Sequence, residues 1–158
     1  MATEFEHKLV VNGDQWRDAV VGRSSLSQAY LATQPDLTIR VRVVDDERAY
    51  LTIKGRQAGI GRPEHEYEIP VADATELLGL AQEGYPISKV RYDLGEPWLG
   101  WVVDEFSGEN AGLVVAELEV PDEDTPWEKP VWAGADVTAD HRYTNAVLYS
   151  HPYARWER

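Results

Sequence analysis

The sequence predicts a mainly β protein (α+β) in which about eight antiparallel strands close into a barrel flanked by a few helices. Short segments of alternating polar and apolar residues follow one another along the chain, with Gly, Pro and Asp between them, as in antiparallel sheets. Charges of one sign recur two residues apart within these segments, so each strand carries a charged face. The 158 residues are 43% hydrophobic, which favours a single domain spanning residues 1–158.

Taken in order, the alternation predicts strands over Thr3–Val10, Leu37–Val44, Arg48–Lys54, Glu64–Val71, Ile87–Leu94, Trp98–Phe106 and Leu113–Val120. Asp73 and Glu76 have the spacing of a capping box and predict a helix through the following leucines. Shorter helices are predicted for Gln15–Val21 and His141–Tyr149. The glycine-rich segment Gly55–Pro63 is interpreted as a mobile hairpin loop.

The charged faces together carry nearly balanced charge. The basic residues on them are Lys8, Arg40, Arg42, Lys54, Lys89 and Arg91, and the acidic ones are Glu4, Glu6, Glu66, Glu68, Asp104, Glu117 and Glu119. For any one strand, the simple alternative is a charged face exposed to solvent. A closed barrel of about eight strands can instead hold one small ligand. We therefore expect the charges to line the interior, with the apolar faces outward under the helices. Such a lining suits a polyanion bound with divalent cations.

Composition excludes several other classes of protein. The net charge of −13 opposes binding to nucleic acid, whose phosphates require exposed Lys and Arg. The absence of Cys excludes disulfides and thiolate metal sites. No apolar run is long enough to cross a membrane, so a cytoplasmic protein with no membrane partner is expected.

The same residues resemble the CYTH, or triphosphate tunnel metalloenzyme, superfamily. The opening Glu4-Phe5-Glu6-His7-Lys8 looks like its ExExK signature, and the resemblance continues in order over nearly the whole chain. It runs through Arg40-Val41-Arg42, Lys89-Val90-Arg91, Glu117-Leu118-Glu119 and a tail from Val137-Thr138 to Asn145. The segment Gln28-Ala29-Tyr30-Leu31 is most similar to the short bacterial inorganic triphosphatases.

The resemblance implies a role for each group of residues. Metal ligands would be Glu4, Glu6, Asp104, Glu117 and Glu119, holding two ions of Mg²⁺ or Mn²⁺. Substrate phosphates would be bound by Lys8, Arg40, Arg42, Lys54, Lys89 and Arg91. Lys8 and Tyr30 would act at the chemical step, although a buried structural tyrosine is the alternative for Tyr30. The supporting carboxylates are Glu66 and Glu68, with Glu64 and Glu66 as the other pairing.

The expected function is divalent-metal-dependent hydrolysis of inorganic triphosphate to pyrophosphate and phosphate. The alternatives within the fold are a class IV adenylyl cyclase and a thiamine or nucleoside triphosphatase. Outside the enzymes, a polyphosphate-binding module is the alternative. The expected partner is a small-molecule polyphosphate, and a homodimer is left open. The six Trp residues are expected to pack in the core, with adenine stacking by one of them as the alternative.

Overall fold

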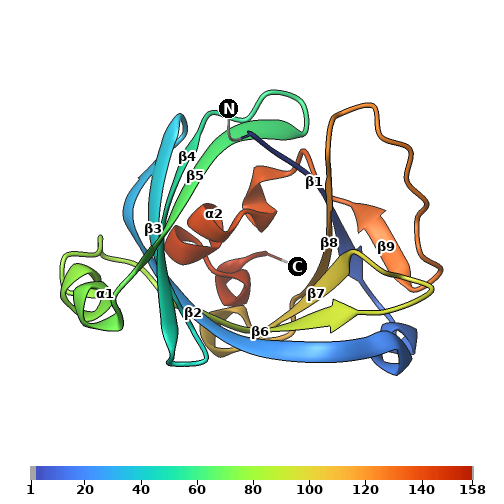
Figure 1. The fold of residues 1–158 in the computed structure, drawn as a ribbon, viewed down its shortest axis with the longest axis horizontal. Coiled ribbons are helices and arrows are strands. Elements are labelled where there is room, and N and C mark those ends of the chain that lie inside the picture. Colours follow the sequence, from blue (N-terminus) through green and yellow to red (C-terminus); the bar gives the residue numbers. More distant parts are fainter. Residues whose placement is uncertain (1–2, 158) are drawn as a thin grey trace.

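The computed structural model describes residues 3–157, and its strands follow one another around a closed ring (Figure 1). The strands are β1 (Thr3–Val11), β2 (Val20–Gln34), β3 (Leu37–Val44), β4 (Arg48–Gly55), β5 (Gly61–Ile69), β6 (Ile87–Leu94), β7 (Trp101–Phe106), β8 (Val114–Val120) and β9 (Ala133–Asp136). Two α-helices, α1 (Val71–Leu78) and α2 (Asn145–Ser150), and four short 3₁₀ helices complete the described elements: η1 (Gln15–Ala19), η2 (Gly108–Asn110), η3 (His141–Tyr143) and η4 (Tyr153–Arg155).

Closure of the barrel depends on β1. The strand order is β5-β4-β3-β2-β6-β7-β8-β1-β9, and a further antiparallel pairing of β5 with β1 closes eight of the strands. Residues Thr3–Phe5 of β1 pair with β5, whereas Leu9 and Val11 pair with β9. The short strand β9 therefore covers the part of the β1 edge that β5 has left, and the predicted closed antiparallel barrel is confirmed.

Some elements of the structure were not predicted, and others differ from the prediction in type or extent. The longest strand, β2, was not predicted, because its serine-rich segment Arg23–Ser27 lacks clear alternation; its pairing with β3 and β6 makes it a strand. Only a 3₁₀ turn, Gln15–Ala19, forms where the helix Gln15–Val21 was expected. The predicted Asp73–Glu76 capping box does not form, because α1 starts earlier, after Pro70, with no side-chain cap.

Other boundaries moved less. The mobile hairpin predicted for Gly55–Pro63 is shorter, since β4 ends at Gly55 and β5 starts at Gly61. The predicted helix His141–Tyr149 divides into η3 and α2. The edge strand β9 was also missed; its four residues, Ala-Gly-Ala-Asp, carry no alternation.

The interior of the barrel has a charged half and an apolar half. Register places Lys89 and Arg91 of β6 on the inner face with Ile87, and Glu117 of β8 on the inner face with Val115. Figure 1 shows α2 within the outline of the ring. Its buried residues Leu148 and Tyr149 join an apolar cluster with Tyr30, Ile87, Phe106, Leu113 and Val115. The C-terminal segment thus fills the apolar half and leaves the charged half open.

The outer faces of the strands are apolar, as expected, and are covered by different parts of the chain. Helix α1 packs Ala74 and Leu77 on Val41 and Ala49. On the other side, Trp16 of η1 and Trp132, which precedes β9, pack with Leu9, Leu94, Trp101, Val103 and Ala116. None of the helices in residues 3–157 has the length and apolar character needed to cross a lipid bilayer.

Candidate active site

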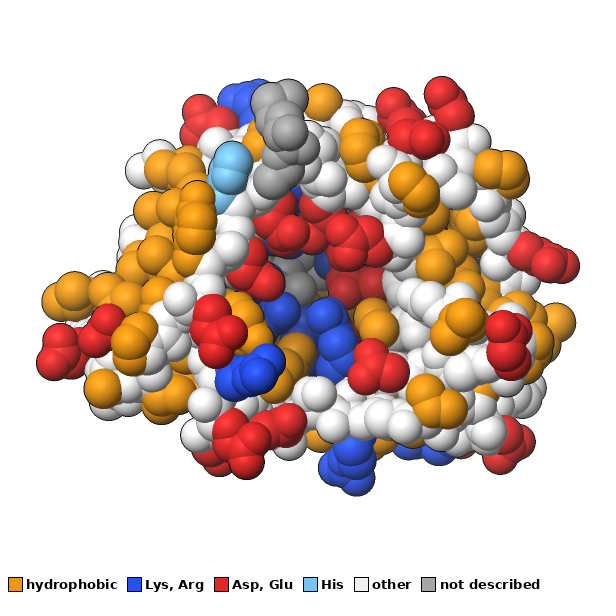
Figure 2. Space-filling model, viewed as in Figure 1, with side chains coloured by type: hydrophobic (Ala, Val, Ile, Leu, Met, Phe, Trp, Pro, Cys, Tyr) orange, Lys and Arg blue, Asp and Glu red, His pale blue; other side chains and the backbone are white. Residues whose placement is uncertain are grey.

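The charged half of the barrel encloses a cavity of about 290 Å³, which we call the tunnel. Figure 2 shows the central hollow, in which acidic side chains gather along one side and Lys and Arg side chains along the other. Of the predicted site residues, the tunnel is lined by Glu4, Glu6, Lys8, Tyr30, Arg40, Arg42, Lys54, Glu66, Arg91, Glu117 and Glu119. Eleven side chains spread over much of the sequence are thus brought to one cavity.

Three predicted site residues do not line the tunnel. Glu68 pairs with Tyr50 in the β4–β5 ladder and is exposed, whereas Glu64 and Glu66 both line the tunnel. The structure therefore brings Glu64 and Glu66 to the cavity as the carboxylate pair. Asp104 and Lys89 are fully buried behind the tunnel surface.

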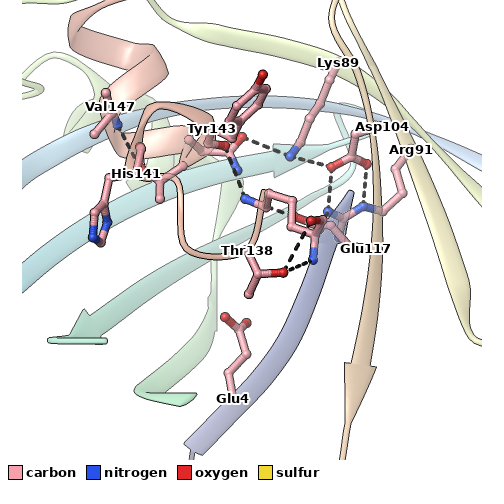
Figure 3. Close-up of polar contacts among 12 residues, drawn as sticks. Glu4, Lys89, Arg91, Asp104, Glu117, Thr138, His141, Tyr143 and Val147 are labelled. Carbon is pink, nitrogen blue, oxygen red and sulfur yellow. Dashed lines mark hydrogen bonds and ion pairs between the residues drawn. The ribbon is translucent and has the colours of Figure 1, made fainter. Parts of the chain in front are cut away.

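Asp104 is the centre of a buried ion-pair network (Figure 3). Arg91 binds it through two parallel hydrogen bonds of 2.8 Å, and the Lys89 Nζ lies 2.8 Å from its Oδ2. Burial opposes ionisation of Asp104, but Lys89 and Arg91 outweigh it and hold its pKa well below the usual value. Burial lowers the pKa of Lys89 to about 7, against the opposing effect of Asp104. The Asp104 carboxylate is ionised and lies 2.8 Å from the Lys89 Nζ, so Lys89 pairs with it as an ammonium.

The network continues into the tunnel. Arg91 donates to Glu117 at 2.9 Å, and the second oxygen of Glu117 lies 3.4 Å from the Lys8 Nζ. Burial opposes both charges, but the carboxylates of Glu117 and Glu6 raise the pKa of Lys8, while Lys8 and Arg91 lower that of Glu117 to about 2. These contacts favour the ammonium form of Lys8, which can bind and orient oxygen atoms.

On the opposite side of the tunnel Glu4 pairs with the Lys54 Nζ at 3.0 Å, whereas Glu6 and Glu119 have no ion-pair partner among residues 3–157. Glu6 lies directly across from Glu119 in the β1–β8 ladder. Burial, followed by the carboxylate of Glu117, raises the pKa of Glu6 to about 7. Burial and Glu4 likewise raise the pKa of Glu119, and burial, with Glu64, raises that of Glu4 although Lys54 opposes the shift. Like charges facing each other across a ladder are destabilising, and a cation between them would relieve the repulsion.

The arginine side of the tunnel is held by polar neighbours. Arg40 donates to Thr52 at 3.1 Å and lies 3.5 Å from Glu66. Arg42 donates to the side-chain oxygen of Gln28 at 2.7 Å. Burial, together with Arg40 and Arg91, lowers the pKa of Arg42 to about 9, and within residues 3–157 Arg42 has no carboxylate ion-pair partner, unlike Arg40.

Tyr30 stands where the charged and apolar halves meet. Its side chain is only 4% exposed, yet it lines the tunnel. Its ring contacts that of Tyr149 in α2 at a centroid distance of 5.4 Å. The structure thus places Tyr30 both in the core and at the cavity. In contrast, none of the six Trp residues lines the tunnel, and the expected packing role agrees with their positions.

Sequence reasoning assigned no role to the C-terminal segment, which contributes Thr138, Thr144 and Asn145 to the tunnel. The Thr138 hydroxyl accepts from the Lys8 backbone N–H at 2.9 Å, and the Tyr143 carbonyl accepts from the Lys8 Nζ at 3.3 Å. The Asn145 side-chain oxygen accepts from the Lys89 Nζ at 3.1 Å. The only signal for this segment was the resemblance of the tail, which indicated no contacts.

The tunnel carboxylates match the chemistry of a divalent-cation site, because hard cations prefer several oxygen ligands. Glu4, Glu6, Glu117 and Glu119 all reach the cavity. Among residues 3–157, no three His, Asp or Glu side chains are already gathered as a metal-binding group. The carboxylate oxygens of these glutamates therefore suit a divalent cation as ligands. To bind one ion together, their side chains would have to move closer to each other.

A closed antiparallel barrel whose interior carries facing rows of carboxylates and basic residues defines a class of charged-tunnel proteins. The family model for the CYTH domain matches residues 2–145. An inorganic triphosphatase from Acetivibrio thermocellus is 44% identical over 99% of both chains. The chain belongs to the CYTH domain family.

Solved structures agree on the fold. The crystal structure of an inorganic triphosphatase is 30% identical, with a TM-score of 0.66 and coverage of 94% of this chain and 95% of the other. A protein from Pyrococcus horikoshii, 19% identical, has a TM-score of 0.58 over 77% of this chain and 80% of its own, which supports the fold alone.

Proposed function

We propose that this protein hydrolyses inorganic triphosphate to pyrophosphate and phosphate in the tunnel, with residues 1–158 acting as one unit. The observation that carries the proposal is the meeting of a basic row and an acidic row in one cavity: within residues 3–157, Arg42 of the basic row has no carboxylate ion-pair partner, and Glu6 and Glu119 of the acidic row have no cationic one. A polyphosphate and divalent cations together would neutralise both rows. The similarity to the inorganic triphosphatase of A. thermocellus supports this substrate.

In the proposed complex, Arg40, Arg42, Lys54 and Arg91 bind phosphate oxygens, and guanidinium groups suit these oxygens because their donors form a fork. Glu4, Glu6, Glu117 and Glu119 hold two ions of Mg²⁺ or Mn²⁺, which supply charge neutralisation and lower the pKa of water. Asp104, previously expected to bind metal, would instead orient Arg91, because it is buried behind the tunnel surface and does not line the cavity.

Lys8 and Tyr30 would act on the reacting groups. The ammonium of Lys8 is held by Glu117 and the Tyr143 carbonyl, so it can orient the attacking water or stabilise charge on the transferred phosphoryl group. The hydroxyl of Tyr30, at the inner end of the tunnel, would relay a proton.

The substrate panel is tripolyphosphate, pyrophosphate, ATP and thiamine triphosphate, assayed for phosphate release with and without Mg²⁺ or Mn²⁺. We expect tripolyphosphate to be cleaved well ahead of ATP, because no aromatic side chain besides Tyr30 lines the described tunnel to receive a base. Formation of cyclic AMP as the main reaction would favour the cyclase. Tight binding of tripolyphosphate with no turnover in either metal would favour the binding module.

A further inference from the structure

We propose that Asn145 binds the substrate directly, donating a hydrogen bond from its side-chain amide to a phosphate oxygen at the inner end of the tunnel, and that Lys89 orients it for this. The proposal rests on the proposed function for the identity of the substrate, and it assigns a contact to Asn145 and a positioning role to Lys89. Asn145 is the first residue of α2 and lines the tunnel.

The orientation of the Asn145 amide follows from the chemistry of Lys89. In the structure the carboxamide oxygen of Asn145 accepts from the Lys89 Nζ at 3.1 Å, and Lys89 lies 2.8 Å from the Asp104 carboxylate, which favours the ammonium that donates this bond. The amide nitrogen, which only donates, is then turned away from Lys89. Among the side-chain hydrogen bonds of residues 3–157, Asn145 takes part only through its oxygen, and its side chain lines the tunnel. Phosphate oxygens only accept, so the remaining donor of Asn145 is matched to them.

Contacts on the side away from the tunnel fix the position of the Lys89 side chain. Its side chain is fully buried, and its Nζ lies 2.8 Å from Asp104 and 5.2 Å from the centre of the Phe106 ring. It does not line the tunnel, so the Asn145 side chain lies at the cavity while Lys89 lies behind it. Lys89 was expected to bind phosphate directly. We assign it an indirect role instead, in which it fixes the orientation of the Asn145 side-chain amide.

The backbone around Asn145 is also anchored. The Thr144 hydroxyl caps α2 by accepting from the Val147 N–H at 3.3 Å. On the far side, Leu148 is fully buried in the apolar half of the barrel. The Lys8 Nζ donates to the Tyr143 carbonyl, so lysines on β1 and β6 both bind residues 143–145. The amide of Asn145 is thus presented from a rigid element, as a preorganised binding group requires.

The decisive variant is Asn145→Asp. The carboxylate has the same shape and still accepts from Lys89, so the link between the C-terminal segment and β6 is kept, but the donor is lost. We expect kcat/KM for tripolyphosphate to fall about 10- to 100-fold with a melting temperature close to that of the wild type, as for a lost hydrogen bond to a charged group. The fall should lie mainly in KM. A role confined to holding the fold predicts normal kinetics for this variant and would overturn the proposal.

Two further variants separate a lost donor from added charge. Asn145→Ala removes the donor without adding charge, and it should also raise KM by about 10-fold or more. Normal kinetics for Asn145→Ala would overturn the proposal even if Asn145→Asp were impaired, since repulsion alone would then explain the loss. Gln82→Glu is the matched control, because it converts an exposed amide outside the tunnel to a carboxylate. It should leave both constants unchanged.

Binding is measured in parallel by calorimetry, with tripolyphosphate in excess chelator so that no turnover occurs. We expect the Kd to rise for both Asn145 variants and to stay constant for Gln82→Glu. An unchanged Kd together with unchanged kinetics refutes the role of Asn145. Failure of the wild type to hydrolyse tripolyphosphate would instead refute the proposed function, while the Kd values would still test the contact.

Discussion

Asp104 illustrates how the surroundings of a side chain decide its chemistry. By its position on a strand it is equivalent to the glutamates of the tunnel, and it was predicted to bind metal. In the structure it is 1% exposed, and Lys89 and Arg91 occupy both of its oxygens. Its neighbours make it an anchor for basic residues.

Asp104→Asn should therefore destabilise the protein strongly. The change leaves the buried Lys89 without a carboxylate partner, while Arg91 keeps only Glu117, and breaking a buried pair in this way costs about 3–5 kcal/mol. For a protein of this size the melting temperature should fall by roughly 6 °C or more. Thermal melting followed by circular dichroism measures the effect. A melting temperature within about 2 °C of the wild type would contradict the anchoring role.

Tyr30→Phe tests the role of a residue that belongs to both the core and the tunnel. The ring keeps its contact with Tyr149, so packing should be almost unchanged. If the hydroxyl takes part in proton transfer, kcat should fall about 10²- to 10⁴-fold with KM retained. Turnover and thermal melting are compared on the same sample. Normal turnover with a lowered melting temperature would indicate a structural tyrosine.

Among the elements, the short segment after β9 fixes the backbone of Lys8. It continues along β1 past the end of β9, where the Val137 N–H donates to the Lys8 carbonyl at 2.9 Å and the Thr138 hydroxyl accepts from the Lys8 N–H. The backbone of Lys8 is thus fixed on the β1 edge that β5 does not reach. The position of Lys8, early in the chain, thus depends on residues near the end of the described chain.

Thr138→Val removes the hydroxyl and keeps the branched shape. The buried Lys8 N–H then lacks its acceptor, which costs about 1–3 kcal/mol. We expect a lower melting temperature and, because Lys8 is less firmly held, a lower kcat. The control is Thr125→Val, which removes a hydroxyl that bonds to Asp122 in an exposed loop. Equal behaviour of the two variants would show that Thr138 does not position Lys8.

Considered as a whole, the tunnel is nearly balanced in charge, but its acidic and basic side chains gather on different sides. Burial, together with neighbouring carboxylates, raises the pKa of Glu4, Glu6 and Glu119, and Glu6 and Glu119 face each other across the β1–β8 ladder, where like charges repel. The free energy that this repulsion costs is available to favour cation binding. Metal affinity and folding stability should therefore be linked.

Mg²⁺ or Mn²⁺ should accordingly raise the melting temperature and be required for turnover. At 100 times its Kd a bound ion adds about 2.7 kcal/mol, which corresponds to roughly 5–10 °C here. Ca²⁺ should bind but inhibit, because it prefers more ligands at longer distances. Glu119→Gln should lose most of the metal-induced shift while remaining folded. Full turnover in excess chelator would contradict metal dependence.

The sequence by itself determined which side chains face inward. Alternation is a local property of an extended chain, so Glu4, Glu6, Lys8, Arg40 and Arg42 could be assigned to one face without knowledge of their neighbours. The expected mainly β class, the closed barrel and ten tunnel residues followed from it, whereas the eleventh, Tyr30, came from the family resemblance. Irregular segments such as β2 and β9 escaped detection because they lack this alternation.

Only the tertiary structure decided which inward charges meet each other and which meet the ligand. Asp104 faces Arg91 because β6 and β7 pair in one particular register, which no local pattern specifies. The inner faces also carry apolar residues such as Ile87 and Val115, and these are buried by α2. The hydrophobic effect draws the C-terminal segment into that half of the barrel, because these side chains would otherwise face water there. This non-local burial places Thr138, Tyr143 and Asn145 beside lysines more than 50 residues away.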